Sequence, residues 1–388
     1  MPDADARTPV RYRSLAAVAF VTGAIAFGGG FAAIAQLRRV IVGDRRWLSE
    51  EAFVERVAVA GALPGTMVTN LLVLVGYELR GLAGALLAAG VFIVPGCALI
   101  ALLAAYYDAL HGTRTIRVAL DGLNPAVAGL FASIAWDLGK STLRKDLRGL
   151  VIALLATVAL VLHVLTLIEV IALAGVIGAI SARPRTPSAP GGAMLVPALA
   201  AGLGLAWSAP LWLVVLGVFG RIGIATFGGG IAMVPAIEHE ALTRGWLDAR
   251  AFADAVAFGQ ITPGPVATTA TFVGWRAGGA VGALAATLGV FAPPTALALL
   301  AARSLRAFRE NRVVQGFLRG VAPAVVGVIA AASWSLGAAS LHGWSDAAIL
   351  LGCALARLKW PRSNPLWALG VAAAVGVARG VALGQLVL

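Results

Sequence analysis

Long apolar runs divide the chain into segments separated by short polar stretches. Runs of about 20 residues, the length that crosses a bilayer as a helix, lie near 15–36, 52–77, 82–106, 117–138, 211–236, 252–275, 281–302 and 321–340. Shorter apolar stretches lie at 149–163, 165–182, 344–358 and 365–386, with a weaker one at 193–207. The pattern predicts an all-α polytopic membrane protein with about 12 to 13 transmembrane segments.

The chain also contains an internal repeat of about two hundred residues. The first copy runs through Phe27-Gly28-Gly29-Gly30, Trp47-Leu48, Ala52-Phe53, Pro64-Gly65, Gly76, Pro125 and Trp136. The same order returns as Phe227-Gly228-Gly229-Gly230, Trp246-Leu247, Ala251-Phe252, Pro263-Gly264, Gly274, Pro323 and Trp334. We therefore expect two equivalent halves, residues 1–190 and residues 191–388, the second half beginning with a linker segment.

Basic residues in the loops indicate that the two halves face opposite sides of the membrane, because short cytoplasmic loops collect Lys and Arg. After the fourth segment the first copy has Lys140, Arg144, Lys145 and Arg148, whereas the equivalent loop 337–347 has no Lys or Arg. Before that segment the second copy is richer, with Arg303, Arg306, Arg309, Arg312 and Arg319 against Arg114 and Arg117. The charges therefore predict that the two copies are inverted-topology repeats. Inversion needs one more membrane crossing between the copies, and the stretch 193–207 can supply it.

One loop does not fit this topology. Arg38, Arg39, Arg45 and Arg46 would lie on the outer side of the membrane. We expect this loop to fold back into the protein or to form a positively charged vestibule that faces anions.

The composition supports a lipid environment over an aqueous one. Of the 388 residues, 60% are hydrophobic and 12% are charged, against roughly 25% charged in an ordinary soluble domain. The net charge of +12 comes from residues between the apolar runs, so lipid head groups explain it and nucleic acid is not an expected partner. Cys97 and Cys353 lie inside apolar runs and the four histidines are scattered, so we expect no metal site and no cofactor.

The repeated glycines and prolines predict helices that are broken within the membrane. A glycine triplet weakens a helix, and proline removes a backbone donor and frees a carbonyl one turn earlier. Freed backbone groups in lipid need a cavity, a neighbour or a ligand, and half-helix N-termini bind anions. Close helix packing is the alternative for a glycine triplet alone. The predicted substrate site consists of Gly28, Gly29, Gly30, Pro64, Gly65, Thr66, Thr69, Asn70, Gly228, Gly229, Gly230, Thr262, Pro263, Gly264, Thr268 and Arg221.

Ionisable residues inside apolar segments are functional candidates. Arg221 lies two turns before Gly228, and contact with an anion and a structural ion pair are both open for it. Glu55 and Asp254 occupy equivalent positions, nine residues before their prolines. For this pair we weigh a coupling role against a salt bridge near the interface with a neighbour such as Arg56. Glu238 is a third coupling candidate, with a solvated helix end as the alternative.

These motifs together resemble the chromate ion transporter family in its long, two-domain form. The resemblance covers about residues 15–140 and 211–340, and Thr66 departs from it where Pro265 completes Pro-Gly-Pro in the second copy. It implies export of chromate across the bacterial inner membrane, conferring chromate resistance, with sulfate as a close isostere. It also implies energy from the proton gradient or the membrane potential. Protons as partners and a homodimer stay open, and membrane lipids are expected around the protein.

The physical reading agrees with a tetrahedral oxyanion without choosing between chromate and sulfate. We expect a secondary transporter that works by alternating access, because the chain has no nucleotide-binding motif. An intramembrane enzyme is the remote alternative, since the apolar segments contain no HExxH motif and no Ser-His pairing. A channel or a scaffold is a third alternative.

Overall fold

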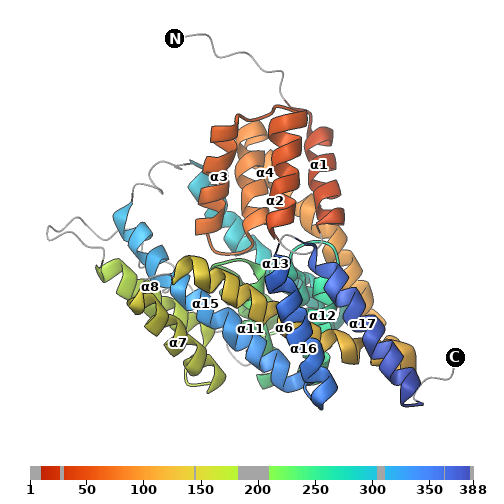
Figure 1. The fold of residues 1–388 in the computed structure, drawn as a ribbon. Helices are drawn as coiled ribbons and strands as arrows, with labels where there is room; N and C mark the ends of the chain where they lie inside the picture. Colours follow the sequence, from red (N-terminus) through yellow and green to blue (C-terminus); the bar gives the residue numbers. More distant parts are fainter. Residues whose placement is uncertain are drawn as a thin grey trace, which may run out of the picture.

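The computed structural model describes residues 10–26, 30–143, 146–181, 209–303, 311–361 and 363–384. Within these ranges every element is a helix (Figure 1). Five stretches are long and apolar enough to cross a membrane, namely Met67–Ala105, Arg114–Thr142, Val266–Arg303, Arg312–Ser340 and Pro365–Ala382. Four shorter helices are also apolar, namely Tyr12–Ile25, Leu147–Val161, Leu167–Ser181 and Leu211–Ala225. The predicted class, an all-α polytopic membrane protein, is confirmed.

Several parts of the sequence predictions lie outside the described residues. They are Gly28 and Gly29 of the first triplet, the proposed extra crossing at 193–207, and the basic residues Arg144, Lys145, Arg306 and Arg309. The inverted orientation and the residue 190/191 boundary therefore stay predictions.

The first repeat begins with short helices that are interrupted at both predicted breaks. Its elements are α1 (Tyr12–Ile25), α2 (Gly30–Arg38), the π-helical η1 (Arg39–Asp44), α3 (Glu50–Ala62) and α4 (Met67–Ala105). The chain between α1 and α2 carries the glycine triplet, and the chain between α3 and α4 carries Pro64-Gly65. Figure 1 shows α1, α2, α3 and the first part of α4 side by side.

The second repeat has an equivalent series, with two 3₁₀-helices where the first repeat has the π-helix η1. Its elements are α10 (Leu211–Ala225), η2 (Gly230–Met233), α11 (Val234–Thr243), α12 (Ala249–Ile261), η3 (Val266–Thr268) and α13 (Thr269–Arg303). The triplet separates α10 from η2, and Pro263-Gly264 separates α12 from η3. Both repeats therefore begin with helices too short to cross a bilayer alone.

Helices α4 and α13 each fold back on themselves at a two-residue turn. In α4 the turn is Arg80-Gly81, where Gly81 has a φ of 63°. A Cβ atom on Gly76 would lie 2.5 Å from the carbonyl oxygen of Gly84, although eight residues of straight helix span about 12 Å. The same turn recurs in α13 at Gly278-Gly279. Gly274 and Gly282 there make the close backbone approach that Gly76 and Gly84 make in α4. The turn falls between the apolar runs predicted at 52–77 and 82–106, and between those at 252–275 and 281–302.

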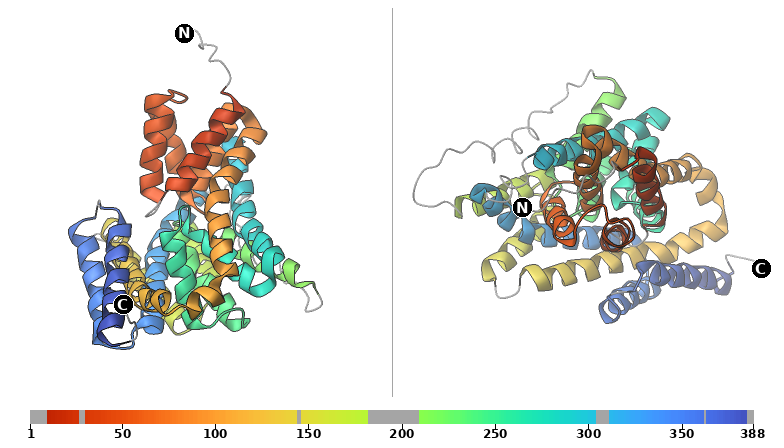
Figure 2. Two further views of the ribbon diagram at one scale, coloured as in Figure 1. Left: turned by 90° about the vertical axis from the view of Figure 1, so that its right-hand side faces the viewer. Right: turned by 90° about the horizontal axis from the view of Figure 1, so that it is seen from above.

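The long central helix of each repeat packs against the terminal helices of the other repeat. Helix α6 (Arg114–Thr142) contacts α16 (Trp344–Lys359) and α17 (Pro365–Ala382). Helix α15 (Arg312–Ser340) contacts α7 (Leu147–Val161) and α8 (Leu167–Ser181). Figure 2 shows this exchange from two further directions.

Small residues allow these exchanged helices to approach closely. A Cβ atom on Gly122 of α6 would lie 2.2 Å from the carbonyl oxygen of Ala372 on α17. Its repeat partner on α15, Gly320, would place a Cβ atom 2.0 Å from the carbonyl oxygen of Ala174 on α8. Neither position has room for a side chain, so the two repeats are interlocked by equivalent contacts.

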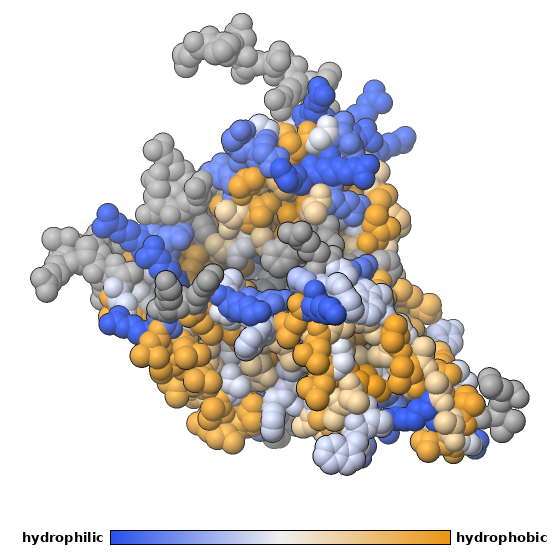
Figure 3. Space-filling model, viewed as in Figure 1, coloured by the Kyte–Doolittle hydropathy of each residue, from blue (hydrophilic) through white to orange (hydrophobic). Residues whose placement is uncertain are grey.

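The outer surface carries rows of exposed apolar side chains. On α7 they recur at helical spacing, at Leu147, Leu150, Val151, Leu154, Leu155 and Val158. Figure 3 shows apolar side chains gathered over α7 and along α17 on the face in view. Such a surface is suited to lipid tails and not to water.

Candidate functional site

Three helix breaks and Ala26, which precedes the first triplet, lie together, and two hydrogen bonds join the repeats there. The amide of Gly65, in the first Pro-Gly break, donates to the carbonyl oxygen of Thr226 at 2.7 Å. Thr226 immediately follows α10 and precedes the second triplet. The equivalent amide of Gly264 donates to the carbonyl oxygen of Ala26, which follows α1, at 3.2 Å. Each Pro-Gly break is therefore bonded to the triplet break of the other repeat.

Close backbone approaches surround these breaks. Gly65 and Gly264 have φ angles of +93° and +107°, which strongly favour glycine. A Cβ atom on Gly65 would lie 2.5 Å from Cβ of Pro294, and one on Gly96 would lie 2.4 Å from the carbonyl oxygen of Pro263. The second halves of α4 and α13 therefore cover the breaks of the opposite repeat.

The second triplet lies against both Pro-Gly breaks. A Cβ atom on Gly230 would lie 2.9 Å from the amide nitrogen of Ala267 in the second repeat and 3.4 Å from Cγ2 of Thr66 in the first. Gly228 and Gly229 have φ angles of +84° and +99°. The predicted convergence of the two breaks in space is thus observed for the described residues.

Helix N-termini meet at this point without side-chain caps. Helices α4, η2 and η3 are preceded by Thr66, Gly229 and Pro265, and none of these side chains accepts a hydrogen bond from its helix. At the outer ends, Ser49 caps α3 and Asp248 caps α12. An uncapped N-terminus presents free amide donors and the positive end of the helix dipole. Helix N-termini of this kind are the backbone feature that binds anions in proteins.

The polar side chains of the first break donate hydrogen bonds to their neighbours, while Oδ1 of Asn70 is buried without a partner. Thr66 donates to the hydroxyl of Thr69 at 2.6 Å. The amide of Asn70 donates to the carbonyl oxygens of Pro64 at 2.9 Å and Ala60 at 3.4 Å. Since Pro64 has no N–H, the carbonyl of Ala60 has no helical partner, and Asn70 supplies one.

The second break holds two buried polar atoms without a partner. They are the hydroxyl oxygen of Thr268 and the side-chain nitrogen of Gln260, while Thr262 donates to the carbonyl oxygen of Gly259 at 3.4 Å. A buried polar atom without a partner is costly unless a ligand satisfies it. Sequence reasoning missed Gln260, although a glutamine in an apolar run one turn before a proline is itself a signal.

The predicted cationic residues differ in their surroundings, and Nε of Arg221 is buried without a partner. Arg221 forms an ion pair with Glu240 at 3.6 Å, and Glu240 also binds Arg244 at 2.7 Å. In the predicted vestibule Arg38 pairs with Glu50 at 2.7 Å, and Arg39, Arg45 and Arg46 are exposed at the outer end of α2 and η1. Nine helical residues separate that end from Gly30, or about 12 Å.

The acidic candidates have different surroundings. Glu55 is half-buried beside Arg56, with Nη1 and Oε2 3.3 Å apart, which matches the salt bridge considered for it. Its repeat partner Asp254 is only 1% exposed and accepts hydrogen bonds from Tyr107 and Asn124, both at 2.6 Å. Glu238 is buried and accepts a hydrogen bond from Ser335 at 2.5 Å. Asp254 therefore lies inside the protein and not in a surface salt bridge.

Comparison with known proteins identifies the family of the chain. The family described as "Chromate transporter" matches residues 13–179 and 213–377. A chromate transport protein of Pseudomonas aeruginosa is 33% identical over 342 residues, covering 84% of this chain and 82% of the relative. A probable chromate transport protein of Synechococcus elongatus is 28% identical, covering 82% and 83%. A chromate transport protein of Cupriavidus metallidurans is 27% identical, covering 90% and 89%.

No solved structure matches this chain. The two matched regions contain the two sets of helix breaks, and between them they cover most of the chain. The chain therefore belongs to the chromate transporter family.

Proposed function

We propose that this chain exports chromate across the bacterial inner membrane and thereby confers chromate resistance. The observation that carries the proposal is the convergence of uncapped helix N-termini from both repeats, joined by the Gly65–Thr226 and Gly264–Ala26 hydrogen bonds. Relatives named chromate transport proteins support the choice of substrate.

A tetrahedral dianion suits this centre for physical reasons. Four oxygen atoms accept hydrogen bonds in diverging directions, and amides from the breaks together with Thr268 and Gln260 offer donors there. Neutral donors bind a dianion without a fixed counter-charge, so the anion can leave again. Exposed Arg39 and Arg45 supply positive charge at the outer end of α2 that attracts anions. Sulfate has the same shape and charge, and it is the alternative substrate.

The buried position of the site supports alternating access. Thr66, Thr226 and Thr262 at the breaks are all at least 95% buried, so an anion reaches them only after the repeats move apart on one side. Two inverted repeats, divided near residue 190, provide two equivalent ways of opening. We propose that an ion gradient, with protons as the coupling ion, drives this exchange. A homodimer is compatible with this scheme but not required by it.

Flux measurements in everted membrane vesicles test the proposal. Vesicles containing the full chain should accumulate labelled chromate, and vesicles without it should not. Sulfate accumulation without chromate accumulation would make sulfate the substrate. Uptake of neither anion would reject the proposed function.

Two glycine variants connect the flux to the breaks. Gly230→Ala places a methyl group against the amide nitrogen of Ala267, whereas Gly90→Ala meets nothing within 4 Å. We expect at least about a tenfold loss of chromate flux for Gly230→Ala, equivalent to about 1.4 kcal/mol, and none for Gly90→Ala. Equal flux in both variants would separate transport from the breaks.

A further inference from the structure

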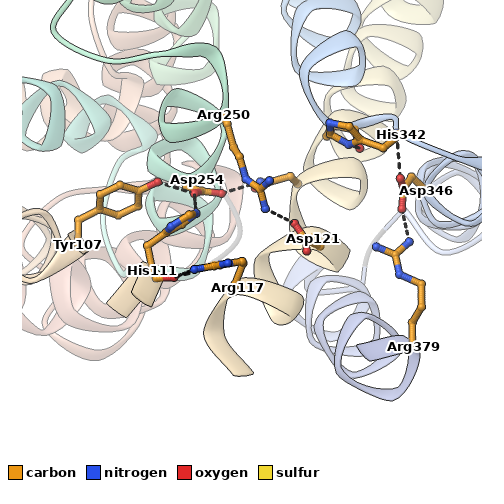
Figure 4. Close-up of polar contacts among 11 residues, drawn as sticks. Tyr107, His111, Arg117, Asp121, Arg250, Asp254, His342, Asp346 and Arg379 are labelled. Atoms are coloured by element: carbon orange, nitrogen blue, oxygen red, sulfur yellow. Dashed lines mark hydrogen bonds and ion pairs between the residues drawn. The ribbon is translucent and has the colours of Figure 1, made fainter. Parts of the chain in front are cut away.

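We propose that Asp254 and His111 form the proton-binding site that couples proton movement to anion transport. Asp254 lies on α12 of the second repeat, and its contacts come from the first repeat (Figure 4). The inference rests on the proposed transport function. It adds a residue-level site for the second transported ion.

Three side chains hold the carboxylate of Asp254. Tyr107, on the short helix α5 (Tyr107–Gly112), donates to Oδ2, and Asn124 on α6 donates to Oδ1. Nε2 of His111, also on α5, lies 3.7 Å from Oδ2. Asp254 is 1% exposed, whereas the side chain of His111 is 29% exposed. The cluster thus links a buried carboxylate to a histidine that water can reach.

The charges around Asp254 leave His111 as its main variable counter-charge. Arg250, one turn earlier on α12, pairs with Asp121 of α6 at 2.7 Å. Arg276 of α13 lies over the ring of Tyr107 and pairs with Asp108 at 2.9 Å. The hydrogen bond from Arg276 lowers the pKa of the exposed Asp108 carboxyl. Two further charged groups have partners of their own. Asp248 caps α12, and Arg117 donates a hydrogen bond to the carbonyl oxygen of His111.

Burial makes a single proton decisive in this cluster. Tyr107 and Asn124 are neutral donors, so a carboxylate at Asp254 beside a neutral His111 is a buried charge held by hydrogen bonds without an ion pair. A proton from water that binds Nε2 of His111 therefore creates an ion pair with Asp254.

The same proton can move onward to Asp254. The N–H bond at Nε2 breaks as an O–H bond forms at Oδ2, leaving a neutral imidazole and a neutral carboxylic acid. The 3.7 Å separation exceeds a hydrogen bond, so the transfer requires the side chains to approach or a water molecule to bridge them. The net charge of the cluster is unchanged by this step.

The position of the cluster connects protonation to the anion site. Asp254 lies eight residues before Thr262 on α12, or about 12 Å from the Pro-Gly break. Because its partners lie on α5 and α6, a change in its charge alters the attraction between the two repeats. The first repeat lacks this arrangement, since Arg56 compensates Glu55 and also binds Glu78. Of these two equivalent acidic positions, Asp254 alone therefore has the buried arrangement.

Accumulation of chromate in proteoliposomes of the purified full chain tests the coupling. With one proton coupled, the accumulation ratio should change by about tenfold per unit of pH gradient. Asp254→Asn should retain tracer chromate exchange but lose this dependence, and His111→Gln should weaken it. The control Asp137→Asn removes an exposed carboxylate from α6, thirteen residues beyond Asn124, and should behave as the wild type. Unchanged pH dependence in Asp254→Asn would overturn the inference.

A second measurement does not depend on transport. Infrared difference spectra of the folded protein between acid and neutral pH should contain a carboxylic acid band that is absent in Asp254→Asn and shifted in Tyr107→Phe. An identical band in Asp254→Asn would also overturn the site. If this band behaves as expected but the wild type exchanges no chromate, the proposed function fails while the proton site stands.

Discussion

The amide of Gly65 donates a hydrogen bond to the carbonyl oxygen of Thr226, and the two residues belong to different repeats. This bond joins a Pro-Gly break to a glycine-triplet break in the middle of the protein. The equivalent bond between Gly264 and Ala26 repeats the arrangement in the other direction. Each repeat therefore completes the broken helices of the other, and neither half forms the central site alone.

Alanine at Gly65 should destabilise the protein more than alanine at Gly81. Both residues have a positive φ, but only Gly65 faces a neighbour, with Cβ of Pro294 at 2.5 Å from an added methyl group. Backbone strain costs about 1–2 kcal/mol, and overpacking adds about 1–3 kcal/mol at Gly65. Thermal unfolding in detergent should therefore show a clearly lower Tm for Gly65→Ala. Equal Tm values would mean that the contact with Pro294 relaxes without cost.

Asn70 should stabilise the protein because Pro64 leaves the carbonyl of Ala60 without a helical partner. Replacing Asn70 with alanine removes the donor to the carbonyl of Ala60, and an unpaired buried carbonyl costs about 1–3 kcal/mol. In a Pro64→Ala background the restored N–H can bond that carbonyl, so the loss should be smaller. A double-mutant cycle on unfolding free energies measures the coupling. Additive losses would contradict the role assigned to Asn70.

Arg221 should contribute to stability and not to anion affinity. Its ion pair with Glu240 is 3.6 Å long and partly exposed, so Arg221→Gln should cost at most about 1 kcal/mol. Glu240→Gln removes this pair and the pair with Arg244, so it should lower Tm at least as much. Chromate affinity should stay within about twofold in both variants. A large loss of affinity in Arg221→Gln alone would assign the arginine to the anion.

The exchanged helices should depend on Gly122. Gly122→Val inserts a side chain into the carbonyl of Ala372 and should abolish the folded, monodisperse protein in size-exclusion chromatography. Gly370→Val lies on the partner helix α17, where an added Cβ atom meets nothing within 4 Å, and it is the control. Normal yield from Gly122→Val would contradict the interlocked packing.

The sequence was informative where backbone chemistry decides the structure. Proline removes a backbone donor and the following glycine accepts a positive φ, so the breaks at Pro64-Gly65 and Pro263-Gly264 were predictable, as was their meeting in space. The exchange of terminal helices was not, because Gly122 and Gly320 have the same local pattern and either set of partners would satisfy it. The distance of a residue from a helix break also did not show whether its side chain is buried. Asp254 was placed near an interface by counting residues, but α5 and α6 enclose it.

Equilibrium binding of radiolabelled chromate to the purified protein tests the central site most directly. Wild type and Gly90→Ala should bind chromate with equal affinity, and Gly230→Ala should bind at least about tenfold more weakly while keeping a folded elution profile. Binding by folded Gly230→Ala with wild-type affinity would contradict an anion site at the helix breaks.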